Sequence, residues 1–235
     1  MYRSSDGQRL RVVVSRYLQT SLAEAARVIT EGRVTVNGYV QKPSYRVAAH
    51  DKLALDGKEI EPPQLYYVAF NKPRGIECTL NRDLTDNLLT VFHHKERLYP
   101  VGRLDKESEG LLLMTNDGSI YHDIAHSDSQ KEKEYYVEVH KPIDEDFIRG
   151  MSEGMIILGQ HTGKSSVVAV DDNPHAFRIV LTRGMNRQIR RMCYKLGFSV
   201  HKLVRLRIMH IHLGNLSPGE MRDLTGVEVA AFRNI

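Results

Sequence analysis

The sequence predicts an α+β protein with a small N-terminal domain followed by a larger domain built on a mixed sheet. Residues 60–64, IEPPQ, contain two adjacent prolines, which exclude a continuing helix or an inner strand, so we place the domain boundary there. The preceding residues combine helical spacing with hairpin signals. The following residues mix strands with few helices and show no repeating βαβ pattern. The strand candidates there are LLLMT (111–115), EYYVEV (134–139) and FRIVLT (177–182).

Length and composition indicate a globular protein with a sizeable core. The chain has 235 residues, of which 41% are hydrophobic and 26% charged, which is ordinary for folded soluble proteins. No apolar stretch reaches the roughly 20 residues that a membrane-spanning helix needs, and the N-terminus lacks the apolar segment of a signal peptide. Two cysteines, Cys78 and Cys193, exclude a disulfide framework and a four-thiolate zinc site. We therefore expect a reduced, cytoplasmic protein that acts as a monomer.

Residues 21–32 have the signals of a helix at both ends. Ser21 is a suitable N-cap, and Glu24 stands three residues further on, as in a capping box. Apolar residues follow at helical spacing, and Gly32 ends the run. The apolar residues are Leu22, Ala25, Ala26 and Ile29.

Two short hairpin signals follow in the N-terminal domain. Val34 and Val36 alternate with a polar residue and lead into residues 37–38, Asn-Gly, a strong two-residue hairpin signal. Leu53 and Leu55 alternate in the same way and end at residues 56–57, Asp-Gly. We expect short strands over both stretches.

Positive charge is concentrated in residues 183–210, which contain eight lysines and arginines and no acidic residue. The whole chain has a net charge of only +4, so the distribution is more informative than the total. A block of one sign is typical of a surface that binds a polyanion, most often nucleic acid. A solvated basic face is the alternative, and the helical motif inside the block favours nucleic acid.

The stretch GRLD, residues 102–105, places Arg103 and Asp105 on a short turn ahead of the apolar run 111–114. Gly102 permits a tight backbone, so both side chains can project into a cleft. Taken alone, the two residues have two interpretations, a structural ion pair or a catalytic carboxylate.

The stretch KEKEYYVEV, residues 131–139, predicts a strand with two different faces. Tyr135, Val137 and Val139 share one face, and Tyr136 and Glu138 share the other. Tyr135 can stack on a nucleobase beside a cleft, or it can belong to the core with its hydroxyl satisfied. The strand pattern leaves both interpretations open.

Residues 186–196 predict a helix that has an apolar stripe and an arginine-rich flank. Asn186 is a suitable N-cap. Arg187 and Arg191 are four residues apart and share the flank, and Arg190 lies about 100° from Arg191. One arginine beside the stripe can reach an active-site carboxylate while the others meet phosphates. The stripe consists of Ile189, Met192, Cys193 and Leu196.

These motifs, in this order, resemble the pseudouridine synthases of the bacterial ribosomal type, the group of small-subunit type A and large-subunit types B, E and F. The N-terminal domain resembles an S4 RNA-binding domain, which this group has ahead of its catalytic domain. EKEYYVEVHKPI with FIRGMSEGMIILG is most similar to the F type, which acts on 23S ribosomal RNA. The matching motifs are NKPRG (71–75), GRLD with GLLLMTNDG (110–118), KEY (133–135), NRQIRRM (186–192) and RDLT (222–225).

The resemblance implies an architecture, an activity and a partner. It divides the chain into an S4-like RNA-binding domain (1–59), a linker (60–65) and a mixed-sheet pseudouridine synthase catalytic domain (66–235). It implies an isomerase that converts one uridine of 23S rRNA to pseudouridine without a cofactor or metal ion, with RNA as its partner and no membrane. The alternatives are the same chemistry on 16S rRNA or tRNA, and a non-catalytic RNA-binding or ribosome-assembly protein.

The resemblance also implies roles for single residues. Asp105 matches the catalytic aspartate, and Tyr135 matches the tyrosine that stacks on the target uracil. Arg103 matches the arginine that holds the flipped nucleotide. Arg190 matches the basic residue that pairs with the aspartate, and Ile189 packs the base pocket. The expected RNA-binding residues are Arg183, Asn186, Arg187, Arg191, Lys202, Arg205, Arg207, Arg9 and Arg33.

The S4-like domain departs from the pattern of its family at one place. Ser21 is followed by Leu22 and Ala23, where the family usually has two arginines. Two phosphate-contacting charges are therefore missing, and the domain binds RNA weakly or through other arginines. These are Arg9, Arg11, Arg16, Arg27 and Arg33.

The chemistry explains why a carboxylate and an aromatic residue would be needed. Isomerisation breaks the N1–C1′ bond, turns the base and joins C5 to C1′, with no redox change and no metal. A carboxylate can assist at C1′ or C6 and later remove the C5 proton, and stacking on a tyrosine offsets the cost of flipping the base.

Two other classes of protein are alternatives to an RNA-modifying enzyme. A non-catalytic RNA binder has no need of Asp105, because a carboxylate facing a polyanion weakens binding. His122 and His126, at i and i+4, suggest a metal-dependent hydrolase, but the sequence shows no clear third ligand or acid-base glutamate beside them.

Overall fold

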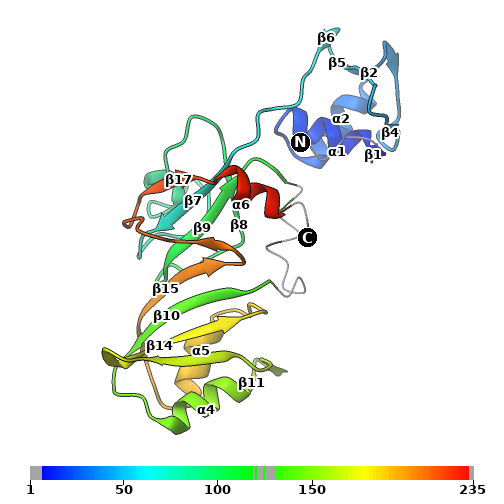
Figure 1. The fold of residues 1–235 in the computed structure, drawn as a ribbon. Helices are drawn as coiled ribbons and strands as arrows, with labels where there is room; N and C mark the ends of the chain where they lie inside the picture. Colours follow the sequence, from blue (N-terminus) through cyan, green and yellow to red (C-terminus); the bar gives the residue numbers. More distant parts are fainter. Residues whose placement is uncertain (1–6, 119, 121–123, 125–130, 233–235) are drawn as a thin grey trace. The chain divides into compact units, whose positions relative to one another are not determined.

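The computed structural model describes residues 7–118, 120, 124 and 131–232. The chain divides into two compact units, Met1–Leu65 and Tyr66–Ile235, which we describe separately (Figure 1). Within the described ranges, no helix has both the length and the apolar character needed to cross a membrane.

The N-terminal unit contains two helices and small antiparallel sheets. One sheet has the order β3-β2-β5-β6, and β1 pairs with β4. The helices are α1 (Leu10–Tyr17) and α2 (Leu22–Thr30). The strands are β1 (Gln8–Arg9), β2 (Val34–Val36), β3 (Tyr39–Val40), β4 (Arg46–Val47), β5 (Leu53–Leu55) and β6 (Lys58–Glu59).

Most local signals of the N-terminal unit are confirmed, but Leu22 of the predicted apolar stripe is exposed, and the Glu24 side chain accepts from Arg27. Ser21 caps α2 by accepting a hydrogen bond from the backbone N–H of Glu24 at 3.1 Å. Asn37 and Gly38 have φ angles of 52° and 85°, the left-handed pair that a tight two-residue hairpin requires between β2 and β3. Ala25 and Ile29 of α2 are fully buried, and they pack in one cluster with α1, β2 and β5.

The C-terminal unit is built on a nine-stranded sheet in the described part of the chain. Its strands are β7 (Tyr67–Lys72), β8 (Tyr99–Val101), β9 (Glu109–Thr115), β10 (Lys133–Val139), β13 (Ser166–Val170), β14 (Asn173–Leu181), β15 (Val200–Ile208), β16 (Ile211–His212) and β17 (Met221–Asp223). The main order is β13-β14-β10-β15-β9-β7-β17, with β8 paired to β9 and β16 paired to β15.

The sheet is mixed, as predicted. Neighbouring strands are antiparallel except β9 and β15, which run parallel and join the two halves of the sheet. Further elements are η1 (Leu88–Thr90), α4 (Glu145–Glu153), the hairpin β11 (Ile156–Ile157) with β12 (Gln160–His161), α5 (Gln188–Lys195) and α6 (Gly226–Ala231). The prediction of an α+β architecture is confirmed.

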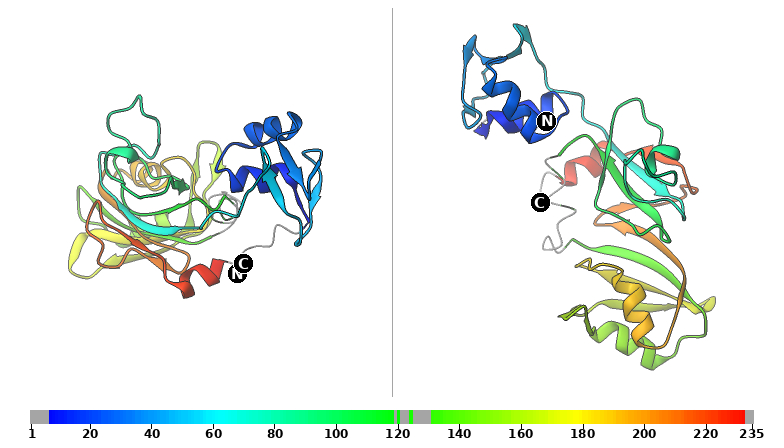
Figure 2. Two further views of the ribbon diagram at one scale, coloured as in Figure 1. Left: turned by 90° about the horizontal axis from the view of Figure 1, so that it is seen from above. Right: turned by 180° about the vertical axis from the view of Figure 1, so that it is seen from behind.

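Helices α4 and α5 cover one face of the β10–β14–β15 half of the sheet (Figure 2). Val137 and Val139 of β10 are buried in the same cluster as the predicted apolar residues of α5, which confirms the inward face of that strand. Residues 111–114 of β9 are buried on both faces, because alternate side chains enter two different clusters. The turn that contains GRLD therefore precedes a strand that is buried on both faces.

Candidate active site

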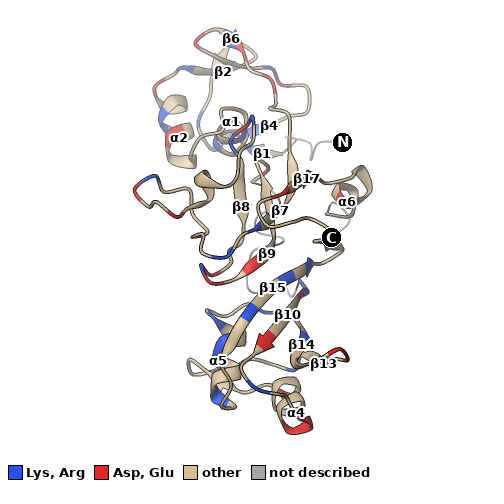
Figure 3. Ribbon diagram, turned by 90° about the vertical axis from the view of Figure 1, so that its left-hand side faces the viewer, with Lys and Arg blue, Asp and Glu red and all other residues tan. Residues whose placement is uncertain are grey.

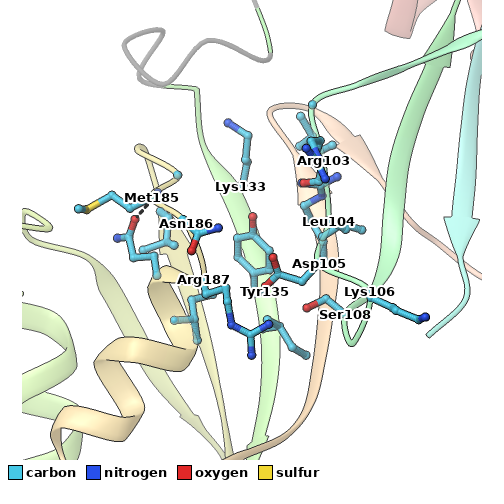
Figure 4. A pocket seen from close by; sticks show the side chains of 18 of the residues that line it. Arg103, Leu104, Asp105, Lys106, Ser108, Lys133, Tyr135, Met185, Asn186 and Arg187 are labelled. Carbon is cyan, nitrogen blue, oxygen red and sulfur yellow. Dashed lines mark hydrogen bonds between the residues drawn. The ribbon is translucent and has the colours of Figure 1, made fainter. Parts of the chain in front are cut away.

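A cavity of about 640 Å³ opens where four segments of the C-terminal unit meet. The segments are the 101–108 turn before β9, residues 133 and 135 of β10, the 184–189 segment that begins α5, and β15. Figure 4 shows Lys133 and Tyr135 on one strand, with Arg103, Leu104 and Asp105 on one side and Met185, Asn186 and Arg187 on the other. The structure thus brings Arg103, Asp105, Tyr135 and Ile189 to one cavity.

The turn that bears Asp105 is held in place by Arg205 of β15. Arg205 is only 3% exposed, and its Nε donates to the carbonyl of Leu111 at 2.7 Å, while Nη1 donates to the carbonyl of Arg103 at 3.3 Å. Gly102 has a φ of 80°, a conformation that glycine adopts without strain. The N–H of Ser108 donates to the carbonyl of Asp105 at 3.0 Å and closes the turn.

The carboxylate of Asp105 is half-buried in this cavity. Among the residues that the structure describes, it has no hydrogen bond and no ion pair. A carboxylate that is partly removed from water and not paired is uncommon, because removal from water disfavours its charged form. The arrangement leaves both carboxylate oxygens available to a ligand.

The direct ion pair predicted between Asp105 and Arg190 does not form. Arg190 instead donates from Nη1 to the carbonyl of Val200 at 3.2 Å and from Nη2 to the carbonyl of Glu107 at 2.9 Å. Burial is the main cause of a lowered pKa of the Arg190 guanidinium, and the charge of Asp105 acts in the opposite direction. Arg190 therefore faces the Asp105 turn as an electrostatic neighbour: both terminal nitrogens donate to backbone carbonyls, and Nε is buried without a hydrogen bond.

Tyr135 and Lys133 lie two residues apart on β10 and point to the same face of the sheet. Tyr135 stands opposite Ile179 of β14 and Arg205 of β15. Lys133 stands opposite Leu181 and Ile208. Burial, followed by the neighbouring charge of Arg205, lowers the pKa of Lys133 to about 8.

The start of α5 differs from the prediction. The N-cap is Arg187, in the left-handed conformation with a φ of 53°, and not Asn186. The Arg187 carbonyl accepts the first helical N–H, from Arg191 at 3.0 Å, while the backbone and side-chain oxygens of Asn186 accept from the Arg191 guanidinium. Gln188 is 4% exposed, and its Oε1 accepts from the N–H of Met185 at 2.9 Å.

Two of the predicted RNA-binding residues have other contacts. Arg205 is buried and donates to backbone carbonyls, a contact with the turn of Asp105 that the sequence did not predict. Arg207 pairs with Glu134 at 3.0 Å and Glu132 at 3.1 Å, and its side chain is 16% exposed. These contacts could not be read from the sequence, because each partner lies more than 70 residues away along the chain. The exposed members of the set are Arg183, Asn186, Arg187, Arg191, Lys202, Arg9 and Arg33.

The arginines of the N-terminal unit are mostly engaged within it. Arg33 pairs with Asp56 at 2.6 Å, and Arg27 pairs with Glu24 and Glu31, each at 2.6 Å. Leu22, at the position where the family usually has an arginine, is 52% exposed. In the described part of this unit, Arg9, Arg11 and Arg46 are the exposed arginines for which the structure describes no ion pair, and Arg46 donates to the carbonyl of Gly7 at 2.6 Å.

Two residues that line the cavity, Lys133 and Gln188, were not among the site residues predicted from the sequence. The sequence could have predicted Lys133, since its position two residues before Tyr135 places it on the same strand face. It could not have predicted Gln188, because a glutamine beside an apolar stripe is ordinarily solvent-exposed.

The metal hypothesis finds no support in the described ranges, where no group of three or more histidine, cysteine or acidic side chains could hold a metal ion. His122 and His126 lie outside the described residues.

Comparison with known proteins gives matches along most of the chain. Residues 66–195 match the model of the RNA pseudouridylate synthase family, and residues 8–53 match the S4 domain. The dual-specificity RNA pseudouridine synthase RluF of Escherichia coli K12 is 43% identical over 94% of this chain and 77% of its own length. The ribosomal large subunit pseudouridine synthase B of Bacillus subtilis is 31% identical over 96% of each chain. A crystal structure of a pseudouridylate synthase superimposes with a TM-score of 0.68 at 26% identity, covering 95% of this chain and 99% of that one.

Proposed function

The chain belongs to the RNA pseudouridylate synthase family, and on that premise we propose that it isomerises one uridine of 23S rRNA, with Asp105 as the catalytic residue. The names of two relatives support this choice of RNA. One is a ribosomal large subunit synthase, and the other is an RNA synthase of dual specificity. The second name also makes tRNA an outcome that the test must include.

One observation carries the proposal: a half-buried, unpaired carboxylate faces a tyrosine across a cavity. The volume of about 640 Å³ is in the range of small-molecule sites and suffices for one nucleotide. A carboxylate needed only for stability would accept a hydrogen bond or form an ion pair, and Asp105 does neither among the residues described. A protein that only binds RNA would gain nothing from this negative charge.

The geometry assigns a task to each side of the cavity. A uracil turned out of its stack would lie on the Tyr135 ring, which replaces part of the stacking energy lost by the RNA. Asp105 would then face the sugar side of the base, where it can act at C1′ or C6 and remove the C5 proton after the base has turned. Ile189, 4% exposed, supplies an apolar wall on the helix side.

The exposed cations around the cavity suit the RNA backbone. Arg183, Arg187 and Arg191 are exposed on and before α5, and Lys202 is exposed on β15. Figure 3 shows lysine and arginine on both of these elements. Contacts from such side chains to phosphates would position the RNA without reading its sequence.

The test is to incubate the protein with unmodified 23S rRNA, 16S rRNA and tRNA transcripts and to map pseudouridines by carbodiimide-dependent reverse-transcription stops. Asp105→Asn keeps the size of the side chain and removes its charge. Asp172→Asn, in the exposed turn between β13 and β14, is the matched control. We expect one new stop in 23S rRNA with the wild type and the control, and none with Asp105→Asn.

The other outcomes separate the parts of the proposal. A stop in 16S rRNA or tRNA alone would keep the chemistry and overturn the choice of 23S rRNA. A stop that persists with Asp105→Asn would overturn the role of Asp105. No stop in any RNA, with RNA binding intact, would favour a non-catalytic RNA-binding protein.

A further inference from the structure

We propose that Lys133 is a further catalytic residue, whose ammonium group contacts a carbonyl oxygen of the target uracil and stabilises the negative charge that the base acquires when its glycosidic bond breaks. The inference rests on the proposed function and concerns the same cavity.

The position of Lys133 in the sheet carries the first part of the argument. Lys133 and Tyr135 rise from one face of β10 and both line the cavity (Figure 4). Residues two apart on a strand are about 7 Å apart, and a lysine side chain spans a similar distance. A base lying on Tyr135 therefore has an edge within reach of Lys133. The register partners of Lys133, Leu181 and Ile208, also line the cavity, so its stem lies between two apolar side chains.

The cations on this face of the sheet, Lys133 and Arg205, lack carboxylate partners in the described part of the chain. The Nζ of Lys133 donates to the carbonyl of Lys131 at 3.2 Å. No carboxylate lies within ion-pair distance of it in the described part of the chain. Arg205, one row further along the sheet, also has no carboxylate partner there, and its Nη2 is buried without a hydrogen bond. Two half-buried or buried cations that lack a counter-ion are costly, unless a negative charge appears between them during function.

The half-buried position of Lys133 favours the uracil base, and not an RNA phosphate, as the source of the negative charge near it. Arg103 and Arg187 line the cavity and are exposed, so phosphates can reach them without leaving water. Lys133 is instead half-buried on the same sheet face as the proposed stacking residue. A phosphate at this depth would lose its hydration, whereas the uracil ring enters the cavity in any case.

The chemical step is balanced without a further reactant. When the N1–C1′ bond breaks, its electron pair stays with the base, and the negative charge spreads from N1 to O2 and O4. C1′ receives an electron pair from the Asp105 carboxylate, which forms an ester bond, or from the C2′–H bond as the carboxylate takes that proton. C5 then attacks C1′; the ester bond breaks and releases the carboxylate, or, on the other route, the proton returns to C2′. The carboxylate finally removes the C5 proton, and N1 takes up one proton, so the product is an isomer of the substrate. Lys133 keeps its proton throughout and acts by charge and hydrogen bonding.

The lowered pKa makes the idea testable by pH. Since burial brings the pKa of Lys133 to about 8, the ammonium group is lost as the pH rises through that value, and the rate should fall with it. Arginine at this position would stay charged over the same range. The other titratable or charged groups that line the cavity are Glu77, Arg103, Asp105, Lys106, Tyr135, Arg187 and Arg205.

The experiment compares Lys133→Met, Lys133→Arg and a control, Lys164→Met, whose lysine is exposed on the loop before β13. The substrate is a 23S rRNA transcript with uridines tritiated at C5. Single-turnover release of tritium gives the rate constant, and filter binding gives the Kd for the same RNA. Each rate is measured from about pH 6 to about pH 10.

We expect Lys133→Met to reduce the rate constant by about 10²-fold, as removal of one preorganised donor typically does, with the Kd changed by less than about threefold. Lys133→Arg should retain a larger part of the rate and lose the fall above about pH 8. The Lys164→Met protein should match the wild type.

Two results would overturn the inference. One is a wild-type rate with Lys133→Met. The other is a loss of rate that an equal loss of RNA affinity explains, which would make Lys133 a phosphate contact. If the wild type itself releases no tritium from 23S rRNA, 16S rRNA or tRNA, the proposed function fails, and that result is distinct from a failure of Lys133→Met alone.

Discussion

Gly110 on β9 is the position where one added methyl group should do the most damage to the proposed active site. It stands opposite Arg205 in the parallel pairing of β9 with β15, and its φ is 105°. A Cβ atom at this position would lie 2.5 Å from the carbonyl oxygen of Arg205 and 2.6 Å from its nitrogen. Both are backbone atoms, so no side-chain rotation can relieve the contact. The two strands would have to separate by about 1 Å to restore van der Waals distances.

The size of the effect follows from two separate costs. A non-glycine residue at a positive φ costs about 1–2 kcal/mol. Forcing an extra methyl group into a packed site typically costs about 1–3 kcal/mol more. We therefore expect Gly110→Ala to lower the free energy of unfolding by about 2–5 kcal/mol, a large part of the total for a domain. Separation of the strands would also loosen the Arg205 hydrogen bonds to Arg103 and Leu111, so activity should fall in the protein that still folds.

The assay is urea unfolding of Gly110→Ala beside Gly159→Ala. Gly159 lies in the two-residue turn between β11 and β12 of the same unit, with a φ of 75° and no atom within 4 Å of an added Cβ. The control therefore has the backbone strain without the collision, and it should lose only about 1–2 kcal/mol. Equal losses in the two variants would refute the argument from close packing of β9 against β15.

Two further predictions concern stability in the C-terminal unit. Asp144→Ala should lower the free energy of unfolding in urea by about 1 kcal/mol, because Asp144 caps α4 by accepting from the N–H of Phe147 at 2.7 Å; an unchanged midpoint would contradict this role. The hydrogen bond from Arg222 is the main cause that lowers the pKa of Glu228 from 4.5 to about 2. The stabilisation is therefore present above about pH 4.5 and is lost as the pH falls towards 2. Glu228→Gln should cost about 1 kcal/mol at neutral pH after solvent screening, and the difference from wild type in urea unfolding should shrink between pH 4.5 and 2.

Local features of the fold could be predicted because their causes lie within a few residues. The cap at Ser21 and the hairpin turn at residues 37–38 depend on hydrogen bonds and backbone angles inside a short segment, and both formed as expected. The inward face of β10 followed from alternation alone. The motif order could likewise be read directly from the chain, and with it the family resemblance.

The details of the site depend on which strands become neighbours, and no short segment encodes that pairing. Arg205 and Arg207 belong to the same basic stretch of sequence, but their contacts differ. Arg205 donates to the carbonyl of Arg103 in the turn that bears Asp105, and Arg207 forms an ion pair with Glu134. Asn186 lost the capping position because its oxygens are taken by Arg191 in the folded loop.

The chain alone was sufficient to predict two domains, an α+β fold, the family resemblance and Asp105 as the candidate nucleophile or base, since each depends on composition or on motifs contiguous in sequence. The charge environment of that aspartate required the folded chain. Pairing of β10 and β15 in one sheet brings Lys133 and Arg205 to the same face, and burial there changes the pKa of the lysine. Electrostatic energies depend on distance in space and on exclusion of water, and both are established when the sheet is assembled.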